Sequence, residues 1–430
     1  MNKFQALKQI SFLWVGSLAG AGCAFLTQII LARALGPEGF GVFASVLSLM
    51  GLLVPLVGFG IAQYWLKEFG KEGWGAMRFV KPSLKFVLLS MALVIALVVI
   101  WAVWGPHDQA MRAALIIMSV FVLGQVSVEL TSGRLQLEER YGTLAVWQLM
   151  PHLARLLFVA VAIKLFGDQF NVESASYLFA LVSLLTIAAS YEPLIKMSKG
   201  ILSLKGHGSQ QAQEKVVEQP RVKDILKNAW PFGLASIFQL IYFQSDIALV
   251  KYITGDVAAG YYNVAFSVMV AVLLLPSILY QKFLLPKMHR WANHDRVLFY
   301  KVYCQGNIVM LFIGGLAMLS VWLISPPVIP FLFGGVYEEA VELLMILAVS
   351  APIIFVAYSV GATLSTQEYM KIKVRMMGAV AIINIVLNLI FIPIYGALGA
   401  AVTTVASNLI LLALYYVGAR AYVFGAYRQA

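Results

Sequence analysis

The sequence predicts an all-α polytopic membrane protein, with about twelve transmembrane helices in two parallel six-helix bundles around a central cavity. Of the 430 residues, 61% are hydrophobic and only 12% are charged, whereas soluble domains are about 45–50% apolar and about 25% charged. Long apolar runs recur along the whole chain, and the loops between them differ strongly in lysine and arginine content. A weak internal repeat relates the first half of the chain to the second.

Each apolar run is long enough to cross a bilayer, whose hydrocarbon core of about 30 Å needs about 20 residues of helix. Helix is expected because lipid offers no hydrogen-bond partner to backbone N–H and C=O groups. A barrel would show a period of two, which these runs lack. The first run is too long for a cleaved signal peptide and is expected to stay as a signal anchor. The predicted spans are 10–32, 41–66, 86–104, 113–131, 143–166, 177–195, 228–250, 260–285, 303–325, 339–364, 374–394 and 397–419.

The basic residues predict that both termini lie in the cytoplasm. With the N-terminus inside, 26 of the 31 lysines and arginines fall in cytoplasmic segments and 3 fall outside. Cytoplasmic loops of membrane proteins carry such an excess. The net charge of +11 is therefore a signal of topology, and we expect the lipid bilayer, and no nucleic acid, as a partner.

The longest loop is polar, low in aromatic residues and cytoplasmic, and it lies near the middle of the chain. A flexible linker has this composition. The predicted domains are therefore an N-terminal six-helix bundle over 1–200, a linker over 201–224 and a C-terminal six-helix bundle over 225–430.

A short stretch near the end of the first span, LARALGPEGFGVF (31–43), has a counterpart in LVKYITGDVAAGYY (249–262). Gly36, Gly41 and Phe43 correspond to Gly255, Gly260 and Tyr262, each pair 219 residues apart. A tight turn between two helices needs glycine to relax the backbone. The recurrence predicts a helical-hairpin corner in each half and a parallel repeat about an axis along the membrane normal, as in transporters whose halves rock around a central substrate site.

Motifs for enzyme chemistry are absent. The chain has no P-loop, no nucleophile elbow and no His or Cys cluster with metal spacing, and Cys23 and Cys304 lie in apolar stretches. We expect a protein that is not an enzyme and has no metal or cofactor, apart from H⁺ or Na⁺ as a coupling ion.

Polar side chains inside the fifth span form a candidate substrate site. Arg155, His152 and Gln148 share one helix face, and an arginine at a helix centre costs about 2.5–3.5 kcal/mol on insertion scales. Arg155 either pairs with an acid or a carbonyl group, or serves as a cavity cation for an anionic substrate. Lys164, near the end of the span, is expected to extend to the membrane surface.

The seventh span carries a second candidate face, formed by Gln239, Tyr242 and Asp246. These residues would line a cavity, with Asp246 as a proton or Na⁺ site, or Asp246 would cap or pair near Lys251.

Asn384 and Asn388 share a face of the eleventh span, as Thr404 and Asn408 do in the twelfth. Hydrogen bonds between helices and contact with a sugar both explain such faces.

Several blocks of the sequence resemble bacterial polysaccharide-export proteins. The blocks are QIILARALGPEGFGVFASVLSLMGLLVPLVGFGIAQYWL, SDIALVKYITGDVAAGYYNVAFSV, LLPKM and NIVLNLIFIPIYGALGAAVTTVASNLI. They are similar to the O-antigen and exopolysaccharide flippases of the multidrug/oligosaccharidyl-lipid/polysaccharide (MOP) superfamily, and the resemblance extends over nearly the whole chain.

The resemblance implies a flippase of the bacterial cytoplasmic (inner) membrane. Such a protein moves an undecaprenyl-diphosphate-linked oligosaccharide to the outer leaflet by alternating access, alongside other glycan-assembly membrane proteins. Arg33, Arg155 and Asp246 fall where this family often carries charged residues. Arginine also suits a diphosphate chemically, because its planar guanidinium binds phosphate oxygens in pairs.

Three alternatives stay open. The first is a cation-coupled multidrug or small-molecule exporter of the same superfamily, although the first span lacks the ion-binding acids of that branch. The second is a membrane enzyme for lipid-linked glycan, which would need a longer outer loop than residues 326–338. The third is a scaffold that transports nothing.

Overall fold

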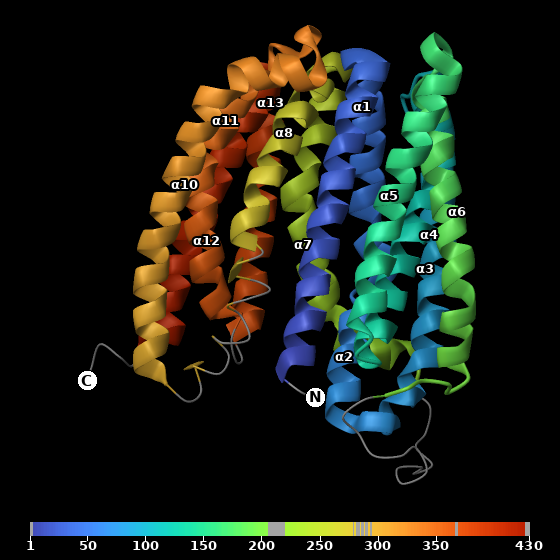
Figure 1. Cartoon of the computed structure of the whole chain (residues 1–430), viewed down its shortest axis with the longest axis vertical. Coiled ribbons are helices and arrows are strands. Elements are labelled where there is room, and N and C mark those ends of the chain that lie inside the picture. Colours follow the sequence, from blue (N-terminus) through green and yellow to red (C-terminus); the bar gives the residue numbers. More distant parts are fainter. Residues whose placement is uncertain are drawn as a thin grey trace. The chain divides into compact units, whose positions relative to one another are not determined.

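Every described element of the computed structural model is a helix, as the sequence predicts (Figure 1). The structure describes residues 3–204, 220–277, 279–280, 284, 288, 291–292, 295–365 and 369–425, with side chains from Trp14 on except at positions 231, 239 and 243. The first half contains α1 (Lys3–Gly58), α2 (Ile61–Glu72), η1 (Gly73–Phe79), α3 (Val80–Trp104), α4 (Gln109–Leu137), α5 (Tyr141–Phe166), η2 (Gly167–Gln169) and α6 (Val172–Ser198). The second half contains α7 (Val222–Thr254), α8 (Asp256–Ser277), α10 (Arg296–Phe333), η5 (Gly335–Tyr337), α11 (Ala340–Ala348), α12 (Ser350–Leu364), α13 (Met370–Gly418) and η7 (Ala419–Val423).

Each predicted span, as far as it is described, falls on one helix or on two successive helices. Among the described residues, seven helical segments are long and apolar enough to cross a membrane, or nine if two bent pairs each count as one span. The first segment, Trp14–Trp104, contains most of three predicted spans, and the last, Met370–Val423, contains two. The chain is thus an all-α multi-pass membrane protein, and the number of twelve crossings stays a prediction.

The breaks within the longest helices fall at glycines. Gly36 interrupts α1 with φ +66°, and Gly396 interrupts α13 with φ +61°. Gly255, with φ +103°, separates α7 from α8. Left-handed backbone costs other residues roughly 1–2 kcal/mol each. The repeated pair Gly36 and Gly255 therefore corresponds to a repeated feature of the backbone.

Several helices begin at a polar residue whose side chain accepts a hydrogen bond from a free backbone N–H group of the first turn. Asp108 caps α4 through the N–H of Met111 at 2.9 Å, and Asn171 caps α6 through that of Ser174 at 2.9 Å. Asp295 caps α10 in the same way. A cap of this kind contributes about 1 kcal/mol, and it fixes where each helix starts.

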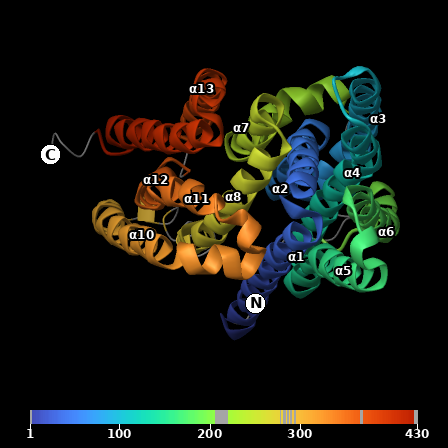
Figure 2. The same cartoon turned by 90° about the horizontal axis from the view of Figure 1, so that it is seen from above.

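The chain packs as two units, and unit 1 comprises residues 1–34 and 46–237. Within it, α4 packs against both α5 and α6 (Figure 2). Small residues let these helices approach closely: a Cβ built on Gly124 of α4 would lie 2.7 Å from the Cβ of Ser183 in α6. Such contacts hold membrane helices together, because lipid provides no hydrophobic force between them.

Unit 2 comprises residues 35–45 and 238–430. Here α12 packs against both α10 and α13 (Figure 2), and a Cβ on Gly314 of α10 would lie 2.5 Å from the Cα of Pro352 in α12. The unit also takes in the part of α1 that follows Gly36. The predicted linker, 201–224, lies mostly outside the described residues, so the predicted domain boundaries stay a prediction.

The second break of the first half offers a test of the backbone. Gly60 has φ +66°, and a Cβ there would lie 2.8 Å from the backbone carbonyl carbon of Phe232. We expect Gly60→Ala to destabilise the fold by about 2 kcal/mol or more and to lower the apparent melting temperature of the purified protein by at least about 5 °C.

Gly70→Ala is the matched control, because Gly70 lies in α2 and a Cβ there would meet nothing within 4 Å. Alanine is about 0.5–1 kcal/mol better than glycine inside a helix, so this melting temperature should stay the same or rise. Equal melting temperatures for the two variants would contradict the described break.

Candidate functional site

Arg155 lies inside unit 1, between α4, α5 and α6. Its side chain comes from the middle of α5 and is only 6% exposed. The guanidinium carbon lies 4.8 Å from the ring centre of Phe121 in α4 and 5.0 Å from that of Phe179 in α6. Contacts of a guanidinium with aromatic rings are worth about 2 kcal/mol or more where water is excluded. The two rings therefore compensate part of the cost of burying this cation.

The hydrogen bonds of Arg155 are incomplete. When the side-chain amide of Gln125 is turned so that its oxygen faces Arg155, this oxygen accepts hydrogen bonds from Nη2 at 3.0 Å and from Nη1 at 3.3 Å. The Nε of Arg155 has no hydrogen-bond partner among the described residues, and no carboxylate of those residues forms an ion pair with this side chain. The sequence left an acid or a carbonyl as the alternative partner. The structure provides an amide and two rings instead.

The other candidates of the first half have different surroundings. His152 is half-buried, lies close enough to Arg155 to interact electrostatically, and faces α1, where a Cβ on Gly20 would be 3.5 Å from its ring. Gln148 is half-buried. Arg33 is exposed just before the Gly36 break, and Lys164 is exposed near the end of α5. The structure thus brings His152 and Arg155 together within unit 1.

Asp246 forms the centre of a polar cluster inside unit 2. This residue of α7 is 2% exposed. Its Oδ2 accepts hydrogen bonds from the hydroxyls of Tyr262 in α8 at 3.0 Å and of Thr404 in α13 at 2.6 Å. Its Oδ1 accepts one from the amide of Asn388 in α13 at 2.6 Å. Three neutral donors from two neighbouring helices therefore surround the carboxylate.

The cluster extends along α13 through further side chains. Asn388 also donates to Asn384 at 3.2 Å, and Asn384 donates to Ser407 at 3.3 Å. Thr403 donates to Asn388, and Tyr242 donates to Asn408. Four predicted site residues, Tyr242, Asp246, Asn384 and Asn388, thus lie in one region of the unit. Gln239 lies in α7, but its side chain is outside the described residues.

A pairing of Asp246 with Lys251 was one interpretation of the sequence. The structure shows Lys251 in an ion pair with Asp256 instead. No cation forms an ion pair with Asp246 among the described residues. A buried carboxylate surrounded by hydroxyl and amide groups can bind a proton, or a hard cation that prefers oxygen ligands.

Sequence reasoning missed several side chains of both clusters. Phe121 of α4 and Phe179 of α6, whose rings contact Arg155, were not singled out from the sequence. Tyr262 was noticed only as the repeat partner of Phe43, and Thr404 only as a neighbour of Asn408. These side chains could not be found from the sequence, because the spacing of residues within one helix does not tell which other helix packs against it.

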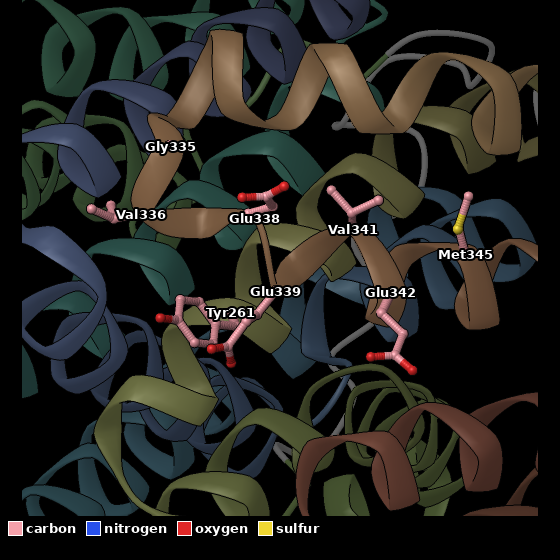
Figure 3. A pocket seen from close by; sticks show the side chains of 8 residues that line it. All are labelled: Tyr261, Gly335, Val336, Glu338, Glu339, Val341, Glu342 and Met345. Atoms are coloured by element: carbon pink, nitrogen blue, oxygen red, sulfur yellow. The ribbon is translucent and has the colours of Figure 1, made fainter.

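A separate cavity of about 550 Å³ lies in unit 2, and Figure 3 shows the side chains that line it. Its lining includes Tyr261 of α8, Val336 of η5 and the carboxylates of Glu338, Glu339 and Glu342. None of these is a predicted site residue. Among the described residues, no group of three or more His, Cys, Asp or Glu side chains is arranged to hold a metal ion.

Comparison with known sequences gives the family. The profile described as "Polysaccharide biosynthesis protein" matches residues 6–291. The chain belongs to this polysaccharide biosynthesis protein family. The sequence-based resemblance is thereby confirmed.

Curated relatives of this family member come from archaea. The chain is 23% identical over 403 residues to the "Probable low-salt glycan biosynthesis flippase Agl15" of Haloferax volcanii, covering 92% of this chain and 79% of the relative. It is 24% identical over 451 residues to the "Uncharacterized membrane protein MJ1068" of Methanocaldococcus jannaschii, covering 94% and 82%.

Solved structures of two kinds share the fold. The lipid II flippase MurJ in an inward closed conformation matches with a TM-score of 0.71 at 13% identity, over 95% of this chain and 87% of that one. An inward-facing multidrug resistance MATE family transporter of the MOP superfamily matches with a TM-score of 0.73 at 14% identity, over 95% and 96%. The fold is thus common to flippases and drug transporters.

The surroundings of Arg155 predict the outcome of removing its charge. Burying a charge without a charged partner is costly, so an apolar side chain of similar volume should be tolerated at this position. We expect Arg155→Met to keep the melting temperature of the purified protein within about 3 °C of the parent, as the control Lys164→Met should. A clear loss of stability in Arg155→Met alone would show that the guanidinium is needed for the fold.

Proposed function

We propose that this protein is a flippase, without enzyme activity, for an undecaprenyl-diphosphate-linked oligosaccharide. The cargo would be a repeat unit of O-antigen, other lipopolysaccharide or exopolysaccharide. Membership of the polysaccharide biosynthesis protein family, similarity to a probable glycan flippase and the fold shared with a lipid II flippase support this proposal. The glycan would enter at the cytoplasmic leaflet of a bacterial inner membrane and leave at the outer leaflet by alternating access.

The observation that carries the proposal is Arg155, a buried cation with an unsatisfied Nε and no acidic partner among the described residues. Leaving such a group unpaired costs free energy, and an anionic cargo group would supply the missing partner. A diphosphate supplies the oxygens that a guanidinium binds best. His152 and Gln148, on the same face of α5, would bind polar groups of the cargo, and exposed Arg33 would attract its charge.

The topology proposed for this function places both termini in the cytoplasm, because 26 of the 31 lysines and arginines would then lie in cytoplasmic segments. Other membrane proteins of glycan assembly would supply the cargo and use it after transport.

A decisive experiment measures the sidedness of the lipid-linked glycan in cells that contain only Arg155→Met or only Lys164→Met. Intact spheroplasts are treated with an impermeant reagent that modifies glycan. We expect the precursor to stay unreachable in Arg155→Met, with export falling at least about tenfold, and to be reached normally in Lys164→Met.

Normal sidedness in Arg155→Met would remove this residue from the mechanism. Normal sidedness in cells that lack the protein, with no redundant flippase, would overturn the flippase proposal. The similarity to a multidrug transporter makes drug export the second candidate, and increased drug sensitivity of the depleted cells would then favour it.

We also propose that H⁺ or Na⁺ drives transport through Asp246. The buried carboxylate has neutral hydrogen-bond donors rather than a cationic partner, and it lies beside amide and hydroxyl oxygens of α13. A cation would neutralise the carboxylate in an environment where an unpaired charge is expensive. Asn384, Asn388 and Tyr242 would shape this ion site, together with Gln239 from the same helix.

In membrane vesicles, we expect flipping by the parent protein to increase with an imposed Na⁺ or proton gradient. Asp246→Asn, which removes the charge and keeps the shape, should abolish this dependence. Asp168→Asn should retain it, because Asp168 is exposed in η2. Full gradient dependence of Asp246→Asn would contradict the proposed ion site.

A further inference from the structure

A segment of the first half of the chain is built into unit 2 by a contact between glycine backbones. The segment is residues 37–45 of α1, which directly follow the Gly36 break. A Cβ built on Gly41 would overlap the carbonyl oxygen of Asp256 and lie 3.0 Å from the backbone nitrogen of Gly260. Conversely, a Cβ on Gly260 would overlap the carbonyl oxygen of Pro37. Only glycine at both positions permits this approach.

The two glycines occupy equivalent positions in the repeat, 219 residues apart. Each lies five residues after a glycine with positive φ, Gly36 or Gly255. The repeat therefore places two equivalent helix starts directly against each other.

Aromatic side chains close the same region. Phe40 and Phe43 of the segment are fully buried, as are Tyr262 and Tyr337 of the unit. The ring of Phe40 meets that of Tyr337 edge-on at 6.3 Å, and Tyr337 meets Tyr261 at 6.0 Å. Residues 37–45 are thus tightly packed against the start of α8, and this packing leaves little room for the segment to shift gradually.

Tyr262 connects the segment of residues 37–45 to the polar cluster around Asp246. It lies two residues after Gly260 in α8, and its hydroxyl binds both Asp246 and Thr404, each at 3.0 Å. When Asp246 is charged, its carboxylate accepts a strong hydrogen bond from the Tyr262 hydroxyl. When Asp246 is neutralised, it loses much of that attraction, because bonds to a charged group are about twice as strong.

We propose that Tyr262 is a positioning residue that couples the charge of Asp246 to the Gly41–Gly260 contact. A change at Asp246 moves the start of α8, and the segment of residues 37–45 follows or separates. The segment continues covalently into residues of unit 1 at both ends, so its displacement passes into the rest of α1. This inference rests on the proposed role of Asp246 as the ion site and names the path by which that site controls conformation.

The test uses a cysteine that reports when the segment loses its burial. Ser45 is fully buried in the segment, one turn after Gly41, whose carbonyl accepts from its hydroxyl at 2.7 Å. Ser45→Cys is made in a full-length chain in which Cys23 and Cys304 are replaced by alanine, and its rate of labelling by a water-soluble maleimide is measured in membranes. Val336→Cys, at an exposed position of η5, gives the rate for an open site.

Gly41→Ala should raise the labelling rate of the reporter at least about tenfold, because the new Cβ forces the backbones apart. Gly22→Ala in the same helix is the control, since nothing lies within 4 Å of a Cβ there, and it should leave the rate unchanged. Fluorescence-detected size exclusion confirms that each variant is folded. If the Gly41→Ala variant is folded and its reporter cysteine is labelled at the parent rate, the Gly41–Gly260 contact does not keep the segment buried, and the proposal is overturned.

Coupling is tested by a double-mutant cycle. Asp246→Asn should change the labelling rate at least about fivefold when Tyr262 is present and less than about twofold in the Tyr262→Phe background, which keeps the ring and removes the hydroxyl. A merely structural role of Tyr262 would leave the effect of Asp246→Asn the same in both backgrounds, and that result would overturn the proposal. So would an absence of any effect of Asp246→Asn.

The coupling through Tyr262 and the ion site at Asp246 can fail separately. Labelling measures coupling within the protein and needs no cargo, whereas sidedness of the glycan and gradient dependence measure transport. If the double-mutant cycle shows coupling between Asp246 and Tyr262 but transport does not depend on the gradient, Asp246 is rejected as the ion site and the coupling is kept. Gradient-dependent transport without coupling would do the reverse.

Discussion

Lipid cannot accept or donate hydrogen bonds, and the rest of this structure depends on that constraint. Each backbone group within the hydrocarbon must find a partner in its own helix, which explains why the described residues form helices and why the breaks are few. The breaks fall at glycines such as Gly36, Gly255 and Gly396, where positive φ is tolerated. With no hydrophobic force between helices in lipid, close contacts of glycine also determine which helices pack together.

The same constraint makes Arg155 and Asp246 conspicuous among the buried charged residues, because Glu68, Arg134 and Glu138 form ion pairs. Arg155 is stabilised by two phenylalanine rings and an amide, and Asp246 by two hydroxyls and an amide. Neither has an oppositely charged partner among the described residues. Arg155 belongs to unit 1 and Asp246 to unit 2, so these two charges of opposite sign lie in different units. In the proposed function, the arginine would bind the anionic cargo and the aspartate the driving cation.

Glycine serves two purposes near the start of α8. At Gly255 it permits a backbone conformation, and at Gly260 it permits another backbone to approach. Tyr262 follows within one turn and binds Asp246. A tight contact and a charge-sensitive hydrogen bond therefore share one short stretch of helix, which is why a change at the cluster reaches the packing of α1.

The sequence by itself determined the helical fold, the positions of the apolar runs and the glycine breaks, because hydropathy and backbone constraints are local properties. Its blocks also resembled the polysaccharide biosynthesis protein family to which the chain belongs. It also identified Arg155, Asp246, Asn384 and Asn388 as costly polar groups within apolar helices. Only the tertiary structure decided their partners: Phe121, Phe179 and Gln125 for the arginine, and Tyr262 and Thr404 for the aspartate. It also showed that Gly41 and Gly260 touch. Those facts depend on which helices face each other, and the periodicity of a single helix carries no information about its neighbour.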